Sequence, residues 1–465
     1  MVNNLIKKRP MLKIRKNITA IIVAAMIGQA AFGSNLQQKL DQIVARKDQQ
    51  KVEFSISVVD PQTGSRIYGH DPMKPMTPAS NMKLVTSFAT LKSIGADYQF
   101  VTKAGLVGGK LVVIGGGDPL LGYDGKDFIS QIVAALKAKN ITQIEYVAVD
   151  NSIFDNERII SNWPKNQLNR DYACEIAGLN YNGNCLKITA SINGGKVVLA
   201  KNPNTEFVRL MNNVKFSKGE SAIGSNRTEQ LNSLVVYGKC GKEASFDVAI
   251  ENPSIYFGTL LSESIYRTGI SIANPLTEES GVQQPMEIIA QFETPITEVL
   301  HHCNKDSLQI AAECLLKTLA AKTSGQPGSW KLGREAVGKY LMSLGADNAE
   351  FYLDDGSGLS SVNKLSSNII SLVILDAYRS PLWATFKPTL AIGGVDGTIK
   401  KQFYKARYKN KVFAKTGYIS GVRALSGVCI SASGKEYIFS ILTNKANYPT
   451  KQAISDIVES IIDEG

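Results

Sequence analysis

Residues 77–83 read Thr77-Pro-Ala-Ser80-Asn-Met-Lys83, and this stretch decides the fold because it opens a helix that must be buried. The sequence predicts Thr77 as the N-cap, followed by proline at the first helical position, where a missing N–H costs nothing. The residues from there to Ile94 are apolar on nearly every face, which is typical of a helix inside a core. Ser80 and Lys83 are three positions apart, so their side chains share one face of this helix.

A hydroxyl and an amine on the same buried face are the parts of a nucleophile and its base. The unpaired N–H groups of the first helical turn can add an oxyanion hole. Taken alone, Ser-x-x-Lys also occurs by chance, and then it marks a capped core helix whose lysine reaches toward water. The whole chain contains three histidines, which argues against a Ser-His-Asp enzyme and favours a lysine as the base.

The N-terminus has the features of a secretory signal. Residues 1–16 contain six cations and no acid, and residues 18–32 are almost wholly apolar. Small residues precede Ser34, so we predict a signal peptide over residues 1–33, with an uncleaved membrane anchor as the alternative. We therefore expect an exported protein of the periplasm or extracytoplasmic cell envelope, with at most peripheral membrane association. Subtracting the six leader cations from the formal charge of +11 leaves +5, a mild excess that suits an anionic cell envelope.

Composition excludes several classes of function. We find no basic stripe interleaved with aromatic residues, so nucleic acid is not an expected partner. The histidines, cysteines and carboxylates do not cluster, and His301-His302 is interpreted as packing or surface, so no metal or other cofactor is expected. The six cysteines permit disulfides in an exported protein. The pair Cys174 and Cys185 is the best candidate, and buried thiols are the equal alternative.

The order of predicted elements indicates an interrupted domain. A hairpin precedes the Ser80 helix, and short strands with Gly/Asn turns then fill residues 97–284. Helices return from Thr294, and a final helix is expected over residues 451–462. The hairpin strands and the late strands are predicted at residues 53–60, 66–69, 411–419, 423–430 and 435–442. This order predicts an α+β fold in two parts, residues 34–96 and 285–465, around an inserted β-rich block, residues 97–284.

One of the late strands carries Lys415-Thr416-Gly417. A lysine on a strand is often a solvated charge at a sheet edge. Its functional interpretation is a cation that grips a carboxylate, next to a hydroxyl, with a glycine that lets a ligand approach the backbone. Together with Ser-x-x-Lys, this motif matches the pattern shared by penicillin-binding proteins and β-lactamases, which predicts a Ser-x-Asn element between the two.

A resemblance to one family becomes specific at this point. Six characteristic stretches occur in order, at residues 59–64, 77–86, 115–119, 355–360, 394–398 and 414–417. From about residue 38 to its C-terminus the chain resembles the D-alanyl-D-alanine carboxypeptidase/endopeptidase family, the class C low-molecular-mass penicillin-binding proteins. The resemblance implies a transpeptidase-like (β-lactamase-like) domain of antiparallel sheet flanked by helices, split by a large insertion after the Ser-x-x-Lys helix.

The third motif departs from the family pattern. The matching segment is Ser307-Leu-Gln309, and the family usually has asparagine where this chain has Gln309. Glutamine keeps the amide but adds one methylene, so its reach toward substrate and lysine differs. A literal Ser-x-Asn occurs at Ser361-Val-Asn363, but it lacks the helical context, so we prefer Ser307 and Gln309.

The resemblance implies roles for the site residues. Ser80 is the nucleophile, Lys83 its base and Ser307 the proton relay, with backbone N–H groups of Ser80 and Tyr418 as oxyanion hole. The implied substrate-binding residues are Gln309, Lys415, Thr416, Gly417 and Tyr418. We predict an exported serine peptidase that cleaves D-Ala-D-Ala-type bonds in peptidoglycan stem peptides and is acylated by β-lactam antibiotics. The alternatives are a serine β-lactamase, which has the same motifs, and a cell-wall binding protein with impaired catalysis, for which Gln309 is the motivation.

Overall fold

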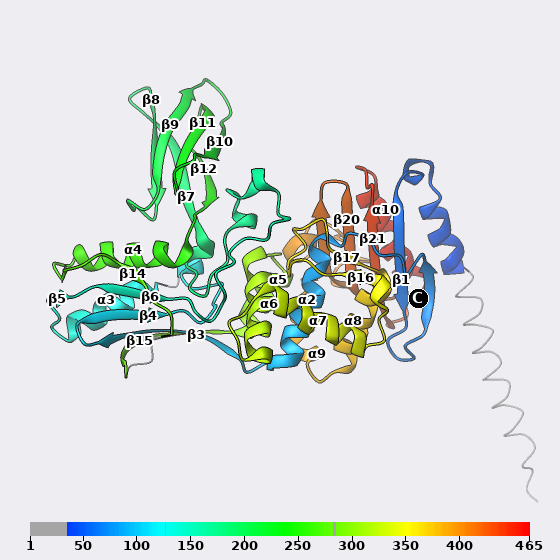
Figure 1. Ribbon diagram of the computed structural model, residues 1–465. Helices are drawn as coiled ribbons and strands as arrows, with labels where there is room; N and C mark the ends of the chain where they lie inside the picture. Colours follow the sequence, from blue (N-terminus) through cyan, green and yellow to red (C-terminus); the bar gives the residue numbers. More distant parts are fainter. Residues whose placement is uncertain (1–34, 126, 282–284) are drawn as a thin grey trace, which may run out of the picture.

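The computed structural model describes residues 35–125, 127–281 and 285–465. The predicted signal peptide, residues 1–33, lies outside them. Figure 1 shows a body of sheet and helices, built from both ends of the chain, and a second part that extends away from it in cyan and green. Within the described residues, no helix is both long and apolar enough to cross a membrane.

The body is built on one six-stranded antiparallel sheet. In spatial order its strands are β18 (Ala391–Ile392), β19 (Val412–Ile419), β20 (Val422–Ile430), β21 (Glu436–Asn444), β1 (Glu53–Val59) and β2 (Arg66–His70). The first two strands of the chain therefore pair with strands that follow the insertion, as Glu53 opposite Asn444 shows. Both faces of the central strands are buried, because helices cover the sheet on each side.

Two helices cover one face of the sheet and a larger group covers the other. On the first face, α10 (Thr450–Glu464) and a helix that runs to residue 44 pack apolar side chains such as Ile457 and Leu40 onto the sheet. The helices of the other face are α2 (Met82–Ile94), α5 (Ile296–Asn304), α6 (Gln309–Ser324), α7 (Trp330–Ser343) and α8 (Ser367–Arg379). Helix α2 lies inside this group, and its residues 82–91 are all buried. The expected buried helix is therefore present.

The start of that helix differs from the prediction. Residues Ala79–Asn81 form a 3₁₀ turn, and α2 begins only at Met82. Thr77 is not its cap: the threonine hydroxyl donates to the Ser361 carbonyl at 3.2 Å and accepts from Lys364 at 2.7 Å. A tertiary partner for the hydroxyl thus replaces the local one that the sequence pattern predicts.

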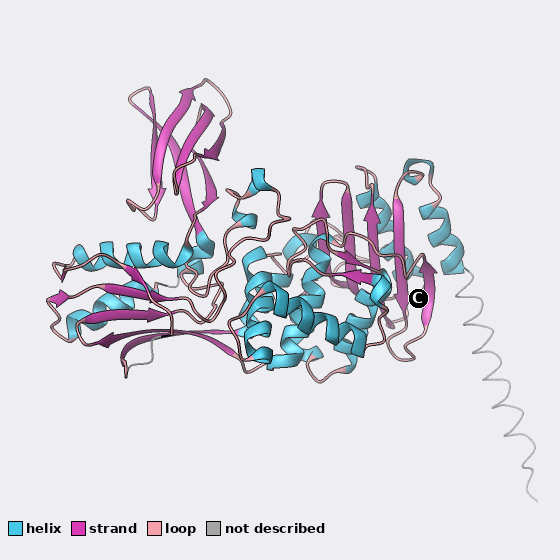
Figure 2. Cartoon of the chain, viewed as in Figure 1, coloured by secondary structure: helices cyan, strands magenta, loops and turns pink. Residues whose placement is uncertain are grey.

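Between α2 and α5 the chain forms three larger sheets and a two-stranded pair of β5 (Gln143–Ile144) with β13 (Ser271–Ile272) (Figure 2). A mixed five-stranded sheet has the order β14 (Thr277–Glu278), β6 (Val147–Asp150), β4 (Lys110–Ile114), β3 (Gln99–Val107) and β15 (Glu287–Pro295). One three-stranded sheet consists of β12 (Ala244–Ala249), β7 (Cys185–Asn193) and β8 (Lys196–Asn202), and another of β10 (Ala222–Arg227), β11 (Ser233–Cys240) and β9 (Arg209–Phe216). The sequence pattern indicates only strands in this block, whereas the structure also has two α-helices there: α3 (Phe128–Ala138) and α4 (Pro253–Tyr266).

The inserted block also returns to the body and holds one of its loops. The indole N–H of Trp163 donates to the buried carboxylate of Asp355 at 2.9 Å. The Trp163 ring meets the ring of Trp330 edge to face, with centroids 6.0 Å apart. Nearby, Asp155 forms an ion pair of 2.7 Å with Lys317 of α6. The insertion is thus tied to the body by hydrogen bonds and rings as well as by its two chain connections.

All six cysteines are free and buried. Burial raises the pKa of the Cys174 thiol to about 12 and that of Cys185 well above its usual range. Of the two alternatives for this pair, the structure has the buried thiols.

Replacing Trp163 by phenylalanine tests the tie between insertion and body. The ring packing largely remains, but the buried Asp355 carboxylate loses one donor, so we expect a loss of stability of about 1–3 kcal/mol. Denaturant unfolding followed by intrinsic fluorescence measures it. Trp383→Phe is the matched control, because within the described chain the indole N–H of Trp383 makes no hydrogen bond. Equal stability of the two variants would contradict the role given to the Trp163 donor.

Candidate active site

Ser80 and Lys83 lie together as the sequence spacing indicates. The Lys83 ammonium nitrogen is 3.1 Å from the Ser80 hydroxyl oxygen. Ser80 sits in the 3₁₀ turn before α2 and is half-buried, whereas Lys83 is fully buried in the first turn of α2. The residue before the serine, Ala79, has φ +46°, a backbone conformation that non-glycine residues rarely adopt. The hydroxyl is therefore accessible at a constrained turn, with its amine partner inside the protein.

Lys83 has two further acceptors from distant parts of the chain. Its Nζ donates to the amide oxygen Oε1 of Gln309 and, at 2.8 Å, to the carbonyl of Ser357. Burial lowers the pKa of Lys83 to about 8, against the opposing effect of the buried carboxylates Glu313 and Asp355. The amine is therefore shifted toward the neutral form that a base requires.

The loop that presents the Ser357 carbonyl is fixed by two buried carboxylates. Glu313 accepts from the N–H groups of Gly356 at 2.9 Å and Ser357 at 2.8 Å, and from the indole of Trp330 at 2.8 Å. Asp355 accepts from the N–H groups of residues 358 and 360, both at 2.7 Å. These bonds hold the loop, and with it one acceptor of Lys83.

Glu313 lies next to the candidate site, and no sequence motif points to it. It lies one turn after Gln309 on α6, in a helix whose neighbouring residues are buried. An acid among buried residues is the signal that could have identified it, because carboxylates are rarely buried without a partner. Burial, together with the nearby charge of Asp355, raises its pKa to about 7.

Lys415 is buried on β19 rather than solvated at the sheet edge. Its Nζ donates to the carbonyl of Thr416 at 3.0 Å, and its own carbonyl accepts from the amide of Asn81, next to the serine, at 2.9 Å. Burial, and next the charge of Lys83, hold the pKa of Lys415 well below its usual range. The charge of one buried amine, Lys83, thus disfavours a proton on the other, Lys415.

Two glycines explain how closely the strand and the loop approach the serine turn. A Cβ on Gly417 would lie 2.7 Å from the Pro78 carbonyl oxygen, and one on Gly358 would lie 1.8 Å from that of Ala79. Gly358 also has φ +82°. The glycine of Lys-Thr-Gly is therefore required by the chain's own turn, which is a different reason from the approach of a ligand that the motif predicts.

Ser307 and Gln309 lie beside this centre, at the start of α6. Ser307 is half-buried with φ +64°, so its backbone is held in the left-handed region. Gln309 contacts Lys83 directly. Among the hydrogen bonds of the described residues none involves the Ser307 side chain, so the structure does not bond it to Ser80 or Lys83.

The alternative motif at residues 361 and 363 has a structural role. The Asn363 amide oxygen accepts from the N–H of Asp354 at 2.8 Å, and its nitrogen donates to the Asp355 carboxylate at 2.7 Å. Asn363 is fully buried and Ser361 is exposed. Asn363 therefore holds the loop, and among the described residues no hydrogen bond joins Ser361 or Asn363 to Ser80 or Lys83.

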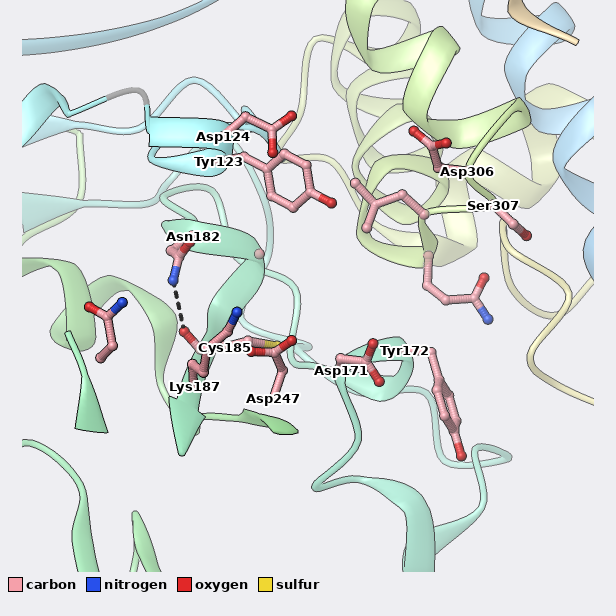
Figure 3. A pocket seen from close by; sticks show the side chains of 14 residues that line it. Tyr123, Asp124, Asp171, Tyr172, Asn182, Cys185, Lys187, Asp247, Asp306 and Ser307 are labelled. Atoms are coloured by element: carbon pink, nitrogen blue, oxygen red, sulfur yellow. Dashed lines mark hydrogen bonds between the residues drawn. The ribbon is translucent and has the colours of Figure 1, made fainter. Parts of the chain in front are cut away.

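Figure 3 shows a pocket of about 570 Å³ between the inserted block and the start of α6. Ser307 and Gln309 form part of its wall, at and just before the start of α6. The four carboxylates that line it are those of Asp124, Asp171, Asp247 and Asp306. Lys187 is the one lysine or arginine among its described lining residues. The space next to Ser307 is therefore acidic. No group of three or more potential metal ligands occurs in the part of the chain that the structure describes.

Two curated relatives of this chain are D-alanyl-D-alanine carboxypeptidases. The chain is 28% identical over 461 residues to a D-alanyl-D-alanine carboxypeptidase of Actinomadura sp. (strain R39), covering 92% of this chain and 85% of the relative. It is 24% identical over 385 residues to D-alanyl-D-alanine carboxypeptidase DacB of Haemophilus influenzae, covering 78% and 79%.

Solved structures confirm the predicted fold class. Penicillin binding protein 4 (dacB) from Haemophilus influenzae matches with a TM-score of 0.77 at 22% identity, covering 92% of this chain and 98% of the other. The same protein complexed with a β-lactam matches with a TM-score of 0.73 at 21% identity, covering 93% and 99%.

The family resemblance inferred from the six motifs is confirmed by a profile that spans nearly the whole described chain. Residues 36–463 match the D-Ala-D-Ala carboxypeptidase 3 (S13) family of peptidases. With a serine and a buried lysine in contact and a carboxypeptidase family profile over this range, the chain belongs to the D-Ala-D-Ala carboxypeptidase 3 (S13) family and is a hydrolase.

Proposed function

We propose that Ser80 of this chain attacks D-Ala-D-Ala-type bonds in peptidoglycan stem peptides and that the protein works outside the cytoplasm. The observation that carries the proposal is the contact of 3.1 Å between the Ser80 hydroxyl and a fully buried lysine amine. Such an amine is a base at near-neutral pH, and a serine hydroxyl is a weak nucleophile without one. The N-terminal signal pattern of residues 1–33 supports export.

Acylation follows from the placement of the groups. Neutral Lys83 takes the proton of Ser80 as the oxygen bonds to the scissile carbonyl carbon. Backbone N–H groups of Ser80 and Tyr418 stabilise the oxyanion. The carbon–nitrogen bond then breaks, and the proton passes through Ser307 to the leaving amine. Water attacks the resulting ester, which releases the acid and restores the serine.

Lys415 and Thr416 hold the carboxylate of the leaving residue in this proposal. A carboxylate bound there favours the charged form of Lys415. A charged Lys415 in turn disfavours a proton on Lys83, because both amines are buried at one site. Substrate binding therefore helps to generate the base that acts on it.

The same chemistry gives a lasting adduct with a β-lactam. Attack on the lactam carbonyl opens the ring, and the amine stays attached to the acyl group, so nothing leaves the site. A slow hydrolysis of this ester distinguishes a peptidase from a β-lactamase, in which rapid turnover is required. The contact of Gln309 with Lys83 supports a competent site rather than a binding protein that has lost catalysis.

Labelling with a fluorescent penicillin tests the nucleophile. Wild type is expected to give one stoichiometric covalent adduct, and Ser80→Ala none, because within the described residues Ser80 is the one hydroxyl bonded to the buried amine. Ser361→Ala, at the exposed serine of the alternative motif, is the control and retains the label. Undiminished labelling of Ser80→Ala would reject the assignment, and sustained rapid hydrolysis of nitrocefin would favour the β-lactamase.

The pH dependence of acylation tests the base. Below its pKa of about 8 Lys83 is protonated and cannot accept the serine proton, so the rate constant rises with pH and levels off above 8. From pH 6 to pH 8 the expected rise is roughly 50-fold, the ratio of neutral amine at the two values. Stopped-flow acylation by a β-lactam measures it, with circular dichroism at each pH as the control for folding. A rate constant that is flat or falls over this range would contradict a lysine base.

Substitution of Gln309 tests what the amide does for the amine. Gln309→Ala removes an acceptor of Lys83, and we expect acylation to slow by roughly 10-fold or more. Gln309→Asn keeps the amide and should stay within a few-fold of wild type. Gln309→Glu adds a negative charge next to the amine, which raises the pKa of Lys83 and moves the pH profile upward. Unchanged rates and an unshifted profile in all three variants would show that the contact is only structural.

A further inference from the structure

A loop of the body is clamped between two helices at the candidate active site. It consists of residues 355–358 and lies between α2, which carries Lys83, and α6, which carries Glu313. Two successive peptide groups of this loop present their carbonyls to α2 and their N–H groups to buried carboxylates. The loop is therefore the structural link between the amine and the carboxylates.

The first of these peptide groups joins Gly356 to Ser357. Its carbonyl oxygen accepts from the hydroxyl of Thr86, which lies on α2 one turn after the buried amine, at 2.8 Å. Its N–H donates to Oε1 of Glu313, on the opposite side, at 2.8 Å. The position of this peptide group is thus fixed from both helices.

The second peptide group joins Ser357 to Gly358 and contacts the amine itself. Its carbonyl oxygen accepts from Lys83 Nζ at 2.8 Å, and its N–H donates to the carboxylate of Asp355 at 2.7 Å. Because successive peptide groups share a residue, a shift of the first group moves the carbonyl of the second. The side chain that holds the first group therefore also determines where the amine finds its acceptor.

Glu313 uses both of its oxygens for this loop and for one ring. Oε2 accepts from the N–H of Gly356 at 2.9 Å and from the indole of Trp330 at 2.8 Å, in addition to the bond at Oε1. A glutamine has a single acceptor oxygen, so its NH₂ group would face another donor in this place. Three donors around one side chain thus require a carboxylate rather than an amide.

The charge of Glu313 has no cation in direct contact. The side chain is fully buried, and within the described chain it forms no ion pair within 4 Å. Lys317, one turn further along α6, is paired with Asp155 instead. A buried charge without a contacting counter-ion acts on other charges nearby, since little water is present to screen it.

Four titratable groups act on Lys83 from the elements packed around it. Burial lowers the pKa of Lys83, whereas the charges of Glu313 on α6 and of Asp355 in the loop raise it. The Cys303 thiol of α5 also acts on it, but burial raises the pKa of this thiol to about 12, so it is uncharged near neutral pH. The fourth group is Lys415 of β19, whose pKa burial holds well below its usual range.

We infer that Glu313 is a positioning residue for Lys83: it holds the loop whose Ser357 carbonyl contacts the amine, and its negative charge opposes removal of the amine's proton. This inference rests on the proposed function, in which Lys83 is the base for Ser80. A stronger base accepts the serine proton more readily, although less of it is neutral at a given pH. Glu313 therefore lowers the fraction of neutral amine and makes the neutral amine a stronger base.

The experiment measures acylation by a β-lactam from pH 6 to pH 9 in wild type and in Glu313→Gln. Loss of the negative charge is expected to move the midpoint of the pH profile down by roughly one pH unit. The rate constant on the plateau should fall roughly 10-fold, because the amine is then a weaker base and the loop is less well held. The pKa of Glu313 is about 7, so its carboxylate is charged at the wild-type midpoint near pH 8.

Two further variants separate the position of the loop from the charge. Glu313→Asp keeps the charge on a side chain one methylene shorter. Thr86→Val removes the donor on the other side of the same peptide group and keeps a side chain of similar shape. In both, the plateau is expected to fall by a few-fold, and the midpoint should stay within about 0.3 pH units of wild type.

Glu350→Gln is the matched control. Glu350 is also a buried carboxylate with side-chain donors, among them the Asn368 amide at 3.0 Å, and it is not among the charges that act on Lys83. Its substitution removes a buried charge elsewhere in the body and should leave the midpoint unchanged. Circular dichroism at each pH checks that every variant is folded.

The inference is wrong if the midpoint of Glu313→Gln stays in place or moves upward, or if Glu350→Gln gives the same shift. If Glu313→Gln does not fold, Glu313→Asp decides: an unchanged plateau would overturn the inference, and a lower plateau at the wild-type midpoint would support it. Failure of the proposed function is visible separately, because Ser80→Ala would then still take up penicillin or wild-type acylation would not depend on pH.

Discussion

The constraint on which this structure depends is the burial of one amine. Lys83 is removed from water inside the helical layer, and a buried amine is costly unless its donors find acceptors. Three parts of the chain supply them: Ser80 before the same helix, Gln309 at the start of α6 and the Ser357 carbonyl in a loop. Glu313 holds this loop in place. Further groups donate to the Asp355 carboxylate of the loop, and one of them, the Trp163 indole, comes from the inserted block. Sheet, helices and insertion are therefore assembled around the environment of a single nitrogen.

A second buried amine changes what the first can do. The charge of Lys83 lowers the pKa of Lys415, after the larger effect of burial, and both amines are fully buried. In such a site the number of protons on the two lysines depends on which ligand is bound. A carboxylate that arrives at Lys415 stabilises a proton there, and the cost of a second proton on Lys83 then rises. In the proposed function, the pair therefore links the binding of a peptide carboxylate at Lys415 to the protonation of Lys83, the base for Ser80.

The sequence contains the local part of this arrangement and omits the long-range part. The spacing of Ser80 and Lys83, the late strands and the final helix follow from periods and motifs, which depend on neighbours along the chain. The partners of Thr77 and the bonds of Glu313 involve residues far away in sequence, so no local pattern predicts them. The same is true of Gly417. A side chain at this position would collide with a backbone carbonyl of the serine turn, which is far away in sequence. The helices α3 and α4, of 11 and 14 residues, lie between strands of a block in which short strands and turns dominate the sequence pattern.

The place of the insertion follows from the geometry of the body. The chain leaves the body after α2 and returns to it at α5. The two connecting strands, β3 and β15, pair with each other, so that Gln99 lies opposite Pro295. Because the two ends of the insertion are neighbours, its length adds little to the entropy of closing the body around it. A block that was only appended to the body would need no contacts beyond these two chain connections. This one also donates from Trp163 to the loop that holds Lys83 in place, and it contributes carboxylates to the pocket at Ser307. Its contacts are therefore those of a part that completes the active site, since removing it would leave the buried Asp355 short of a donor and the pocket without one wall.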